Sequence, residues 1–320
     1  MSLVVISTGG TIASTADSGG DATPSLSGDD LVDAVPGLES IAAIEVEEFA
    51  NVPSQFFSLV QVYDLLERVR AHDADPSVDG IIVTQGTNTL AESSYFLDLC
   101  YDGDTPVVFT GAMRNPSMVS PDGPMNLLAS ARVATDPETA DAGVVAVHNE
   151  RIHAARDVNK HHTMNLDTFR SAEFGPLGTV DEDRVVWRRR PVDPDPTLDP
   201  DRDALRRDVE TVTVTMDMTD AQLRACTDRA GLVLGTMGAG HLPETLVDGL
   251  RAVRAAGVPV FASCRIHEGR LLRDRYGYAG SEHLLRELDC YYSDLNPVKT
   301  RVKAIVALAA DRLDDAFEQP

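Results

Sequence analysis

The sequence predicts an α/β fold: a larger N-terminal doubly wound domain with a mostly parallel sheet, followed by a second, smaller α/β domain. Short apolar, β-branched runs recur along the chain, each followed by Gly or Thr and then by a segment with helical periodicity. Such runs are typical of strands buried on both faces of a parallel sheet, and their alternation with helices indicates right-handed crossovers. A stretch rich in Pro and Asp interrupts the alternation, which resumes beyond it.

The N-terminal domain is expected at residues 1–190, the linker at 191–210 and the C-terminal domain at 211–320. The first domain's expected strands are Leu3–Ile6, Gly80–Val83, Pro106–Phe109 and Gly143–Val147, and its helices are Leu59–Ala71, Ala91–Leu99 and Met125–Ala134. The second domain's expected strands are Gly231–Leu234 and Val258–Ala262, and its helices are Glu244–Ala256 and Val298–Leu308. Asp122-Gly123-Pro124 precedes the third helix, as expected for a proline in the first helical turn.

The charge excludes some partners. The formal net charge is -23, from 51 acidic against 28 basic residues, and the acids are scattered along the chain. This field repels phosphate backbones, so nucleic acid is not an expected partner. An Asp-rich, Lys-poor surface resembles that of proteins from a high-salt cytoplasm, although an ordinary acidic enzyme remains an alternative. No apolar stretch is long enough to span a membrane and no signal peptide precedes the first strand, so we expect a cytoplasmic protein.

The four cysteines, Cys100, Cys226, Cys264 and Cys290, are widely spaced and form no C-x-x-C pair. We therefore expect buried free thiols rather than a disulfide framework or a metal site. His161 and His162 are adjacent and so point apart, and no third ligand is spaced to complete a metal site.

Ligands of open α/β sheets bind beyond the carboxyl ends of the strands. That rule selects Ser7–Ser14, Thr84–Thr89 and Thr110–Arg114, which are rich in glycine and hydroxyl residues. The glycines of the first segment match neither the dinucleotide-binding nor the P-loop pattern, which argues against nucleotide binding. A threonine nucleophile is the other interpretation, and it needs a neighbouring base. Lys160 is the only lysine of the first domain, which suggests a functional role, and an ordinary surface lysine is the alternative.

Taken together and in order, the motifs resemble those of the bacterial-type L-asparaginase family over nearly the whole chain. The matching segments are Thr8-Gly9-Gly10-Thr11-Ile12-Ala13, Gln85–Glu92 (similar to H-G-T-D-T-x-x-E), Gly111–Arg114 with Asp122–Leu127, Lys160 with Leu166–Phe169, Gly238–His241, and Asp294–Lys299. The family includes glutaminase-asparaginases and an archaeal tRNA-amidotransferase subunit.

The resemblance implies a role for each of seven residues. Thr11 would be the nucleophile and form an acyl-enzyme, and Thr87, beside Lys160, would help activate the nucleophile or water. Ser54 and Gln55 would hold the α-carboxylate and α-amino groups of the substrate, and Asn88 stands where the family has an aspartate that pairs with the ammonium. The carbonyl of Ala112 would accept from the leaving amide nitrogen, and backbone N–H groups near Thr87 would stabilise the oxyanion.

The resemblance also implies a homodimer or homotetramer that uses no metal and no organic cofactor, with L-asparagine as substrate and glutamine as a poorer one. Two departures from the family pattern stand out. Asn88 carries no charge to pair with the substrate ammonium. The family's lid tyrosine is also missing from the segment 17–27, which is predicted to be a mobile loop, and Tyr276 is a candidate substitute.

Three functions remain open at this point. The first is a stand-alone L-asparaginase that hydrolyses L-asparagine to L-aspartate and ammonia. The second is the ammonia-releasing amidase subunit of a tRNA-dependent amidotransferase, which the acidic surface and the early position of the first motif disfavour. The third is a weakly active or non-catalytic binder of an amino acid, which Asn88 and the missing tyrosine favour.

Overall fold

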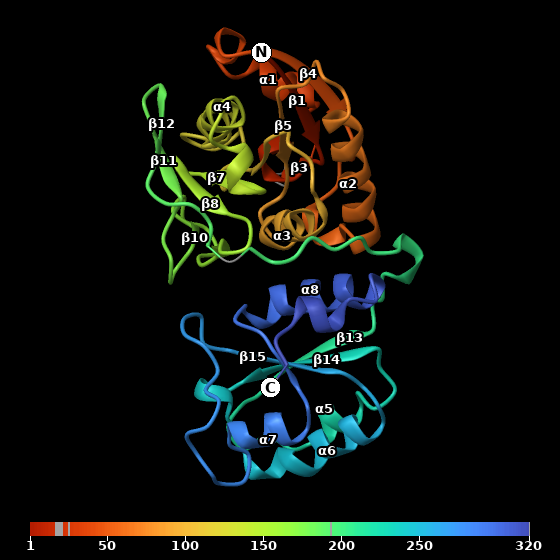
Figure 1. The fold of residues 1–320 in the computed structure, drawn as a ribbon. Helices are drawn as coiled ribbons and strands as arrows, with labels where there is room; N and C mark the ends of the chain where they lie inside the picture. The colour runs from red at the N-terminus through yellow and green to blue at the C-terminus, as the bar shows by residue number, and fades with distance from the viewer. Residues whose placement is uncertain (17–21, 25, 193, 320) are drawn as a thin grey trace. The chain divides into compact units, whose positions relative to one another are not determined.

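The computed structural model describes residues 1–16, 22–24, 26–192 and 194–319. The chain divides into two compact units, Met1–Thr197 and Leu198–Pro320, which are considered one at a time below (Figure 1). The predicted mobile loop at 17–27 falls largely on residues 17–21 and 25, which lie outside the described residues. The finer boundaries 1–190, 191–210 and 211–320 stay a prediction.

Unit 1 is built on an eight-stranded sheet. In order across the sheet, the strands are β12 (Arg184–Trp187), β11 (Gly178–Asp181), β8 (Arg151–Ala154), β7 (Val145–His148), β6 (Val107–Thr110), β5 (Gly80–Thr84), β1 (Ser2–Ser7) and β4 (Ala43–Glu48). The pairs from β4 to β7 are all parallel, whereas β8, β11 and β12 add antiparallel pairs. The sheet is therefore mixed but mostly parallel in its central part, which confirms the predicted fold class.

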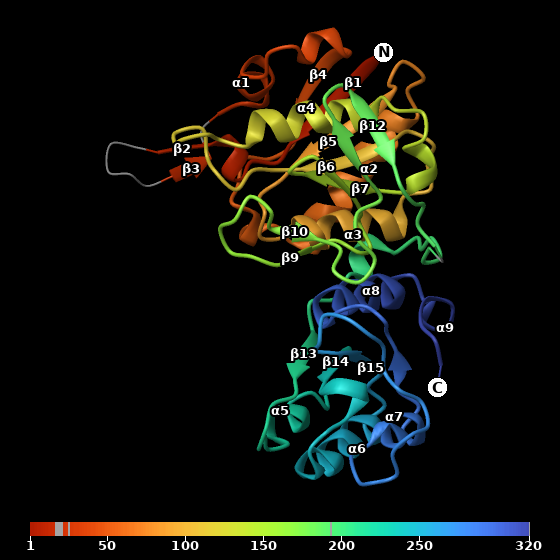
Figure 2. The same cartoon turned by 90° about the vertical axis from the view of Figure 1, so that its left-hand side faces the viewer.

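Helices cover both faces of this sheet (Figures 1 and 2). One face carries α1 (Gly28–Asp33) and α4 (Gly123–Ala134), and the other carries α2 (Leu59–Asp73) and α3 (Leu90–Cys100). Helix α2 begins with a capping box, in which Ser58 accepts from the Gln61 backbone and Gln61 accepts from the Ser58 backbone. Two short ribbons complete the unit, β2 (Ser14–Ala16) with β3 (Ala22–Pro24), and β9 (Asn159–Lys160) with β10 (Phe169–Arg170).

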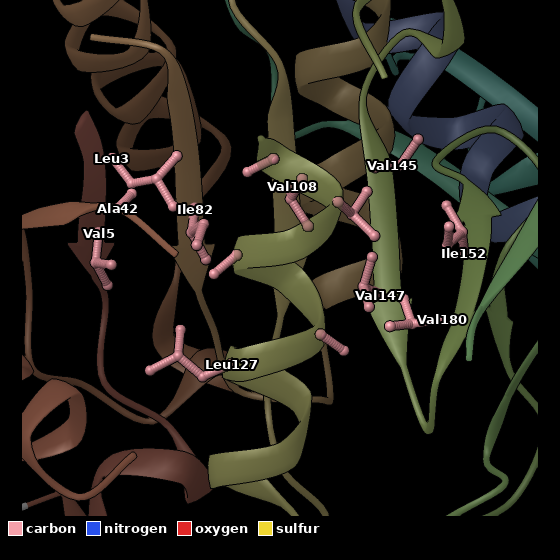
Figure 3. Packing of buried hydrophobic residues seen from close by; sticks show 14 of the residues in the cluster. Leu3, Val5, Ala42, Ile82, Val108, Leu127, Val145, Val147, Ile152 and Val180 are labelled. Atoms are coloured by element: carbon pink, nitrogen blue, oxygen red, sulfur yellow. The ribbon is translucent and has the colours of Figure 1, made fainter. Parts of the chain in front are cut away.

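The core beneath α4 explains why the apolar runs form strands. The four neighbouring strands β1, β5, β6 and β7 contribute Leu3, Val5, Ile82, Val108 and Val145, which pack with Leu127 of α4 (Figure 3). All six side chains are almost completely buried. Because alternate residues of a strand point to opposite faces, these residues fill one layer and their neighbours fill the other.

The order of the strands places the candidate site. From β1 the chain first adds β4 on one side and then β5 on the other, so the direction of winding reverses at β1. In open α/β sheets this reversal opens a crevice at the carboxyl ends of the two diverging strands. The loops that leave β1 and β5 carry Thr11 and Thr87.

Unit 2 is a four-stranded parallel sheet with helices packed on it. Its strands, in order, are β13 (Val209–Thr213), β14 (Gly231–Thr236), β15 (Val260–Cys264) and β16 (Tyr291–Tyr292). Its helices are α5 (Ala221–Arg224), α6 (Val247–Ala255), α7 (Glu282–Glu287), α8 (Pro297–Ala309) and α9 (Leu313–Ala316).

All four cysteines of the chain are buried and outside any disulfide, as predicted. In the described part of the chain, no helix combines the length and apolarity needed to cross a bilayer.

Candidate active site

A tight turn presents Thr11 immediately after β1. Gly9 and Gly10 have φ of 91° and 87°, a region that L side chains seldom adopt. The Ala13 N–H and the Ser14 hydroxyl both donate to the Gly10 carbonyl, at 3.1 and 2.8 Å. The turn therefore makes Thr11 the first residue of a short 3₁₀ helix, Thr11–Ala13, in which Ile12 and Ala13 are buried.

Three chain segments meet at two glycines. A Cβ atom on Gly10 would lie 2.4 Å from the Cα and N atoms of Gly86, so the two backbones are in direct contact. A Cβ atom on Gly86 would lie 2.6 Å from the Ser54 Oγ. Thr11 and Thr87 directly follow the two glycines, so this close approach brings their segments and that of Ser54 together.

Gly10→Ala is expected to destabilise the protein by roughly 2–4 kcal/mol, because it combines a backbone clash with an unfavourable φ. Gly175→Ala is the matched control: Gly175 also has a positive φ, 73°, but a Cβ atom there meets nothing within 4 Å. The control should cost only about 1 kcal/mol, the penalty of the left-handed conformation. Urea unfolding of both variants measures the difference, and equal losses would show that the two loops do not touch.

Lys160 lies against Thr87, 73 residues away in the sequence. Its Nζ donates to the Thr87 Oγ1 at 2.9 Å and to the Asn88 Oδ1 at 3.2 Å. Lys160 belongs to β9 and pairs with Phe169 of β10, so a two-residue antiparallel ladder fixes its backbone. Partial burial lowers the pKa of the Lys160 ammonium. Thr87 itself is 7% exposed, so this contact is partly shielded from bulk water.

The predicted substrate-binding residues lie at different depths. Ser54 is buried at the start of a 3₁₀ helix, Ser54–Phe56, and its carbonyl accepts from the Thr89 Oγ1 at 3.1 Å. Ala112 is buried and packs with Ile12, next to Thr11. Gln55 and Asn88 are exposed. The described contacts thus join Ser54, Asn88 and Ala112 to the threonine loops, whereas no described hydrogen bond joins the Gln55 side chain to them.

A polar cluster behind this site was not predicted from the sequence. Asp122 accepts from the Met113 and Arg114 N–H groups, and the buried Asn126 amide links Asp122 to the Gly111 carbonyl. His148 is fully buried, with Nδ1 3.4 Å from the Asn126 Nδ2. Burial lowers the pKa of His148 to about 4, with the Lys160 charge adding to the shift and Asp122 opposing it. In the sequence, Asp122–Leu127 indicates a helix start and is one of the family-like segments, but it predicts no site role for Asp122 or Asn126.

Tyr276, the candidate substitute for the missing tyrosine, lies in unit 2 and is exposed there. It belongs to a cluster around His241, whose ring is 5.0 Å from that of Tyr276. The His241 Nε2 lies 3.1 Å from the carboxylate of the buried Glu282, and its Nδ1 lies 2.9 Å from the Tyr278 hydroxyl. His241 is therefore held by polar and ring contacts with other residues of unit 2.

The arrangement in unit 1 has the parts of an acyl-transfer site. Two threonine hydroxyls at adjoining loops offer nucleophiles, and a half-buried lysine of lowered pKa, hydrogen-bonded to one of them, offers a proton acceptor. Backbone N–H groups of the glycine-containing loops are the type of donor that stabilises a developing oxyanion.

Comparison with known proteins bears on the same two units. The N-terminal asparaginase family model matches residues 2–193, and the C-terminal domain model of glutaminases and asparaginases matches residues 208–319. The chain is 37% identical to a probable L-asparaginase of Deinococcus radiodurans, over 96% of this chain and 92% of that protein. It is 33% identical to L-asparaginase 2 of Bacillus subtilis, over 95% of this chain and 81% of that protein.

A solved structure has the same fold. The structure of a probable cytoplasmic L-asparaginase from Campylobacter jejuni matches with a TM-score of 0.83 and 28% identity, covering 96% of this chain and 94% of that chain. Both family models and relatives that span nearly the full chain agree, and the chain therefore belongs to the asparaginase family.

Proposed function

We propose that this protein is an L-asparaginase, which hydrolyses L-asparagine to L-aspartate and ammonia. The match to L-asparaginases along nearly the entire chain carries the proposal. The contact between Lys160 and Thr87 supports it independently, because it couples a hydroxyl to a base beyond the carboxyl end of β5. Glutamine is the expected poorer substrate, in keeping with the shared glutaminase and asparaginase C-terminal domain.

In the proposed mechanism, the Thr11 hydroxyl attacks the side-chain amide carbon, and its proton passes to the leaving nitrogen. Ammonia departs and leaves an aspartyl ester on Thr11. Water then attacks this ester, which releases aspartate and restores the hydroxyl. The Thr87–Lys160 pair would accept and return the protons, for which the lowered pKa of Lys160 suits it. These steps use only side chains, backbone groups and water, and no metal or cofactor.

Substrate recognition would come from the residues that surround the threonines. Ser54 and Gln55 would bind the α-carboxylate and α-amino groups, and the Ala112 carbonyl would accept a hydrogen bond from the leaving nitrogen. Asn88 would face the substrate ammonium with a neutral amide oxygen, which also accepts from Lys160 at 3.2 Å. We further propose a homodimer or homotetramer that works in the cytoplasm and tolerates high salt.

Asn88→Asp is expected to raise kcat/KM for asparagine, because a carboxylate would pair with the substrate ammonium. The same carboxylate would stand beside Lys160 and raise the pKa of its ammonium. Since the neutral amine is the form that accepts a proton, the rise of kcat/KM with pH should move to higher pH. Asn115→Asp makes the same charge change in another loop and should leave the profile unaltered. Unchanged or lower activity in Asn88→Asp at every pH would contradict the prediction.

Ammonia release from asparagine by the purified full-length chain, measured at low and high salt, tests the proposed function. Release with asparagine, and less with glutamine, is the expected result. Binding of asparagine without any release would instead favour a non-catalytic amino-acid binder. Copurification with tRNA or with a second subunit would favour the amidotransferase alternative.

A further inference from the structure

The backbone conformation around Ala112 is held from both sides by two side chains. We propose that Asp122 and Asn126 are positioning residues that aim the main-chain carbonyl of Ala112 at the leaving nitrogen of the substrate. This inference rests on the proposed function and adds to it the two side chains that orient the Ala112 carbonyl.

The first support is the peptide plane between Ala112 and Met113. In a trans peptide the C=O of one residue and the N–H of the next are coplanar and point in opposite directions. The Met113 N–H donates to the Asp122 carboxylate at 3.0 and 3.1 Å, and the Arg114 N–H donates to it at 2.8 Å. By binding the Met113 N–H, Asp122 therefore fixes the direction of the Ala112 carbonyl, which must point away from the carboxylate.

The second support is the preceding peptide plane, which contains the Gly111 carbonyl and the Ala112 N–H. The Asn126 Nδ2 donates to the Gly111 carbonyl at 2.9 Å and to the Asp122 carboxylate at 3.1 Å. Both planes that flank Ala112 are thus bound to one Asp–Asn pair at the start of α4. Asn126 is 2% exposed, so water does not compete for these bonds.

Asn126 of this pair is also connected, through intermediate residues, to the two-stranded ladder that carries Lys160. The Asn126 Oδ1 accepts from the Asn149 N–H at 2.9 Å, in the turn between β7 and β8. His148, beside that turn, has its ring centroid 4.7 Å from that of Phe169, the cross-strand partner of Lys160. A chain of contacts thus leads from Asn126 through the turn between β7 and β8 and through Phe169 to the ladder that holds the proposed base.

The proposed role depends on the chemistry of an amide. When the tetrahedral intermediate collapses, the C–N bond breaks, and the nitrogen takes up a proton and leaves as ammonia. A hydrogen bond from an N–H of this nitrogen to the Ala112 carbonyl would orient the nitrogen as it leaves. An ester has no N–H at the leaving atom and cannot use the acceptor. Loss of the positioning pair should therefore impair amide cleavage selectively.

Asp122→Asn tests this role with two substrates, L-asparagine and the β-methyl ester of L-aspartate. Both carboxylate oxygens of Asp122 accept hydrogen bonds, and the NH2 group of an asparagine would face donors instead. We expect kcat for asparagine to fall about tenfold or more with little change in KM, while turnover of the ester stays close to wild type. The ratio of amide to ester activity is the diagnostic quantity.

Asp73→Asn is the matched control. Asp73 also accepts a backbone N–H, that of Thr105 at 2.9 Å, but it does so before β6 rather than after it. Its ratio of amide to ester activity should equal that of the wild type. If Asp122→Asn does not fold, Asn126→Ser removes the donor to Gly111 and should lower the ratio in the same way.

Equal losses on both substrates, or no loss on either, would overturn the positioning role. A wild-type protein that releases no ammonia from asparagine would overturn the proposed function itself. An active wild type whose substrate ratio is insensitive to Asp122→Asn and Asn126→Ser would overturn only the inference about Ala112.

Discussion

Thr11→Ala is expected to lower kcat for asparagine by about 10⁴-fold or more, because it removes the proposed nucleophile. Thr11 is the first residue of its 3₁₀ helix, and the turn that presents it is held by bonds to the Gly10 carbonyl. Removing the hydroxyl should therefore leave the loop in place. Ammonia release, together with the affinity for the product aspartate, measures the loss of chemistry separately from binding.

Thr11→Ser is the control for this variant, since it keeps a hydroxyl at the same position. It should retain a measurable part of the activity, and both variants should bind aspartate. Activity in Thr11→Ala within tenfold of the wild type would remove Thr11 from the chemistry and favour Thr87 as the nucleophile.

Lys160→Met is expected to lower kcat by about 10³-fold, the usual scale for a general base. Methionine keeps roughly the length of the side chain but removes the hydrogen bond of 2.9 Å to the Thr87 hydroxyl. The pH dependence gives a sharper result. Burial lowers the pKa of Lys160, and the neutral amine accumulates as the pH rises through that value. The wild-type kcat/KM should therefore rise over this range, and the rise should vanish in Lys160→Met.

Lys160→Arg separates the charge from the base, because an arginine keeps the charge but does not release its proton. It should fail to restore activity. Lys303→Met in α8 removes an equal charge in unit 2 and should be close to wild type. Substantial activity in Lys160→Arg would show that residue 160 acts only through its charge.

The parallel part of the fold was predictable because strands that are buried on both faces have continuous apolar sequences. Strand β1 spans Ser2–Ser7 and β5 spans Gly80–Thr84, around the apolar runs that predicted them. Strand β4, Ala43–Glu48, was not predicted. It lies at the edge of the sheet and carries three glutamates, so its sequence lacks the continuous apolar run of the central strands.

The antiparallel part was harder to predict, because short strands leave little periodicity. The turn between β7 and β8 consists of Asn149 and Glu150, both at positive φ, which is typical of a two-residue hairpin. Glutamate is not a usual residue for such a turn, so the hairpin had no clear signal. The ladder that holds Lys160 has only two residues in each strand.

For the candidate site, the sequence predicted several of the residues but not the tertiary contacts that position them. The rule on the carboxyl ends of strands selected the loops of Thr11, Thr87 and Ala112. The backbone contact of Gly10 with Gly86 depends on β1 lying beside β5, which no local pattern reveals. Asp122 and Asn126 were overlooked as site residues because their role depends on contacts with the loop after β6.

The most direct test of the account is to locate the covalent intermediate. Asparagine turnover by the wild type and by Lys160→Met is quenched with acid, and the digested protein is examined by mass spectrometry. An aspartyl group on the peptide that contains Thr11, absent from Thr11→Ala, is the expected result. The same group on the peptide that contains Thr87, or undiminished labelling in Thr11→Ala, would contradict the proposed nucleophile.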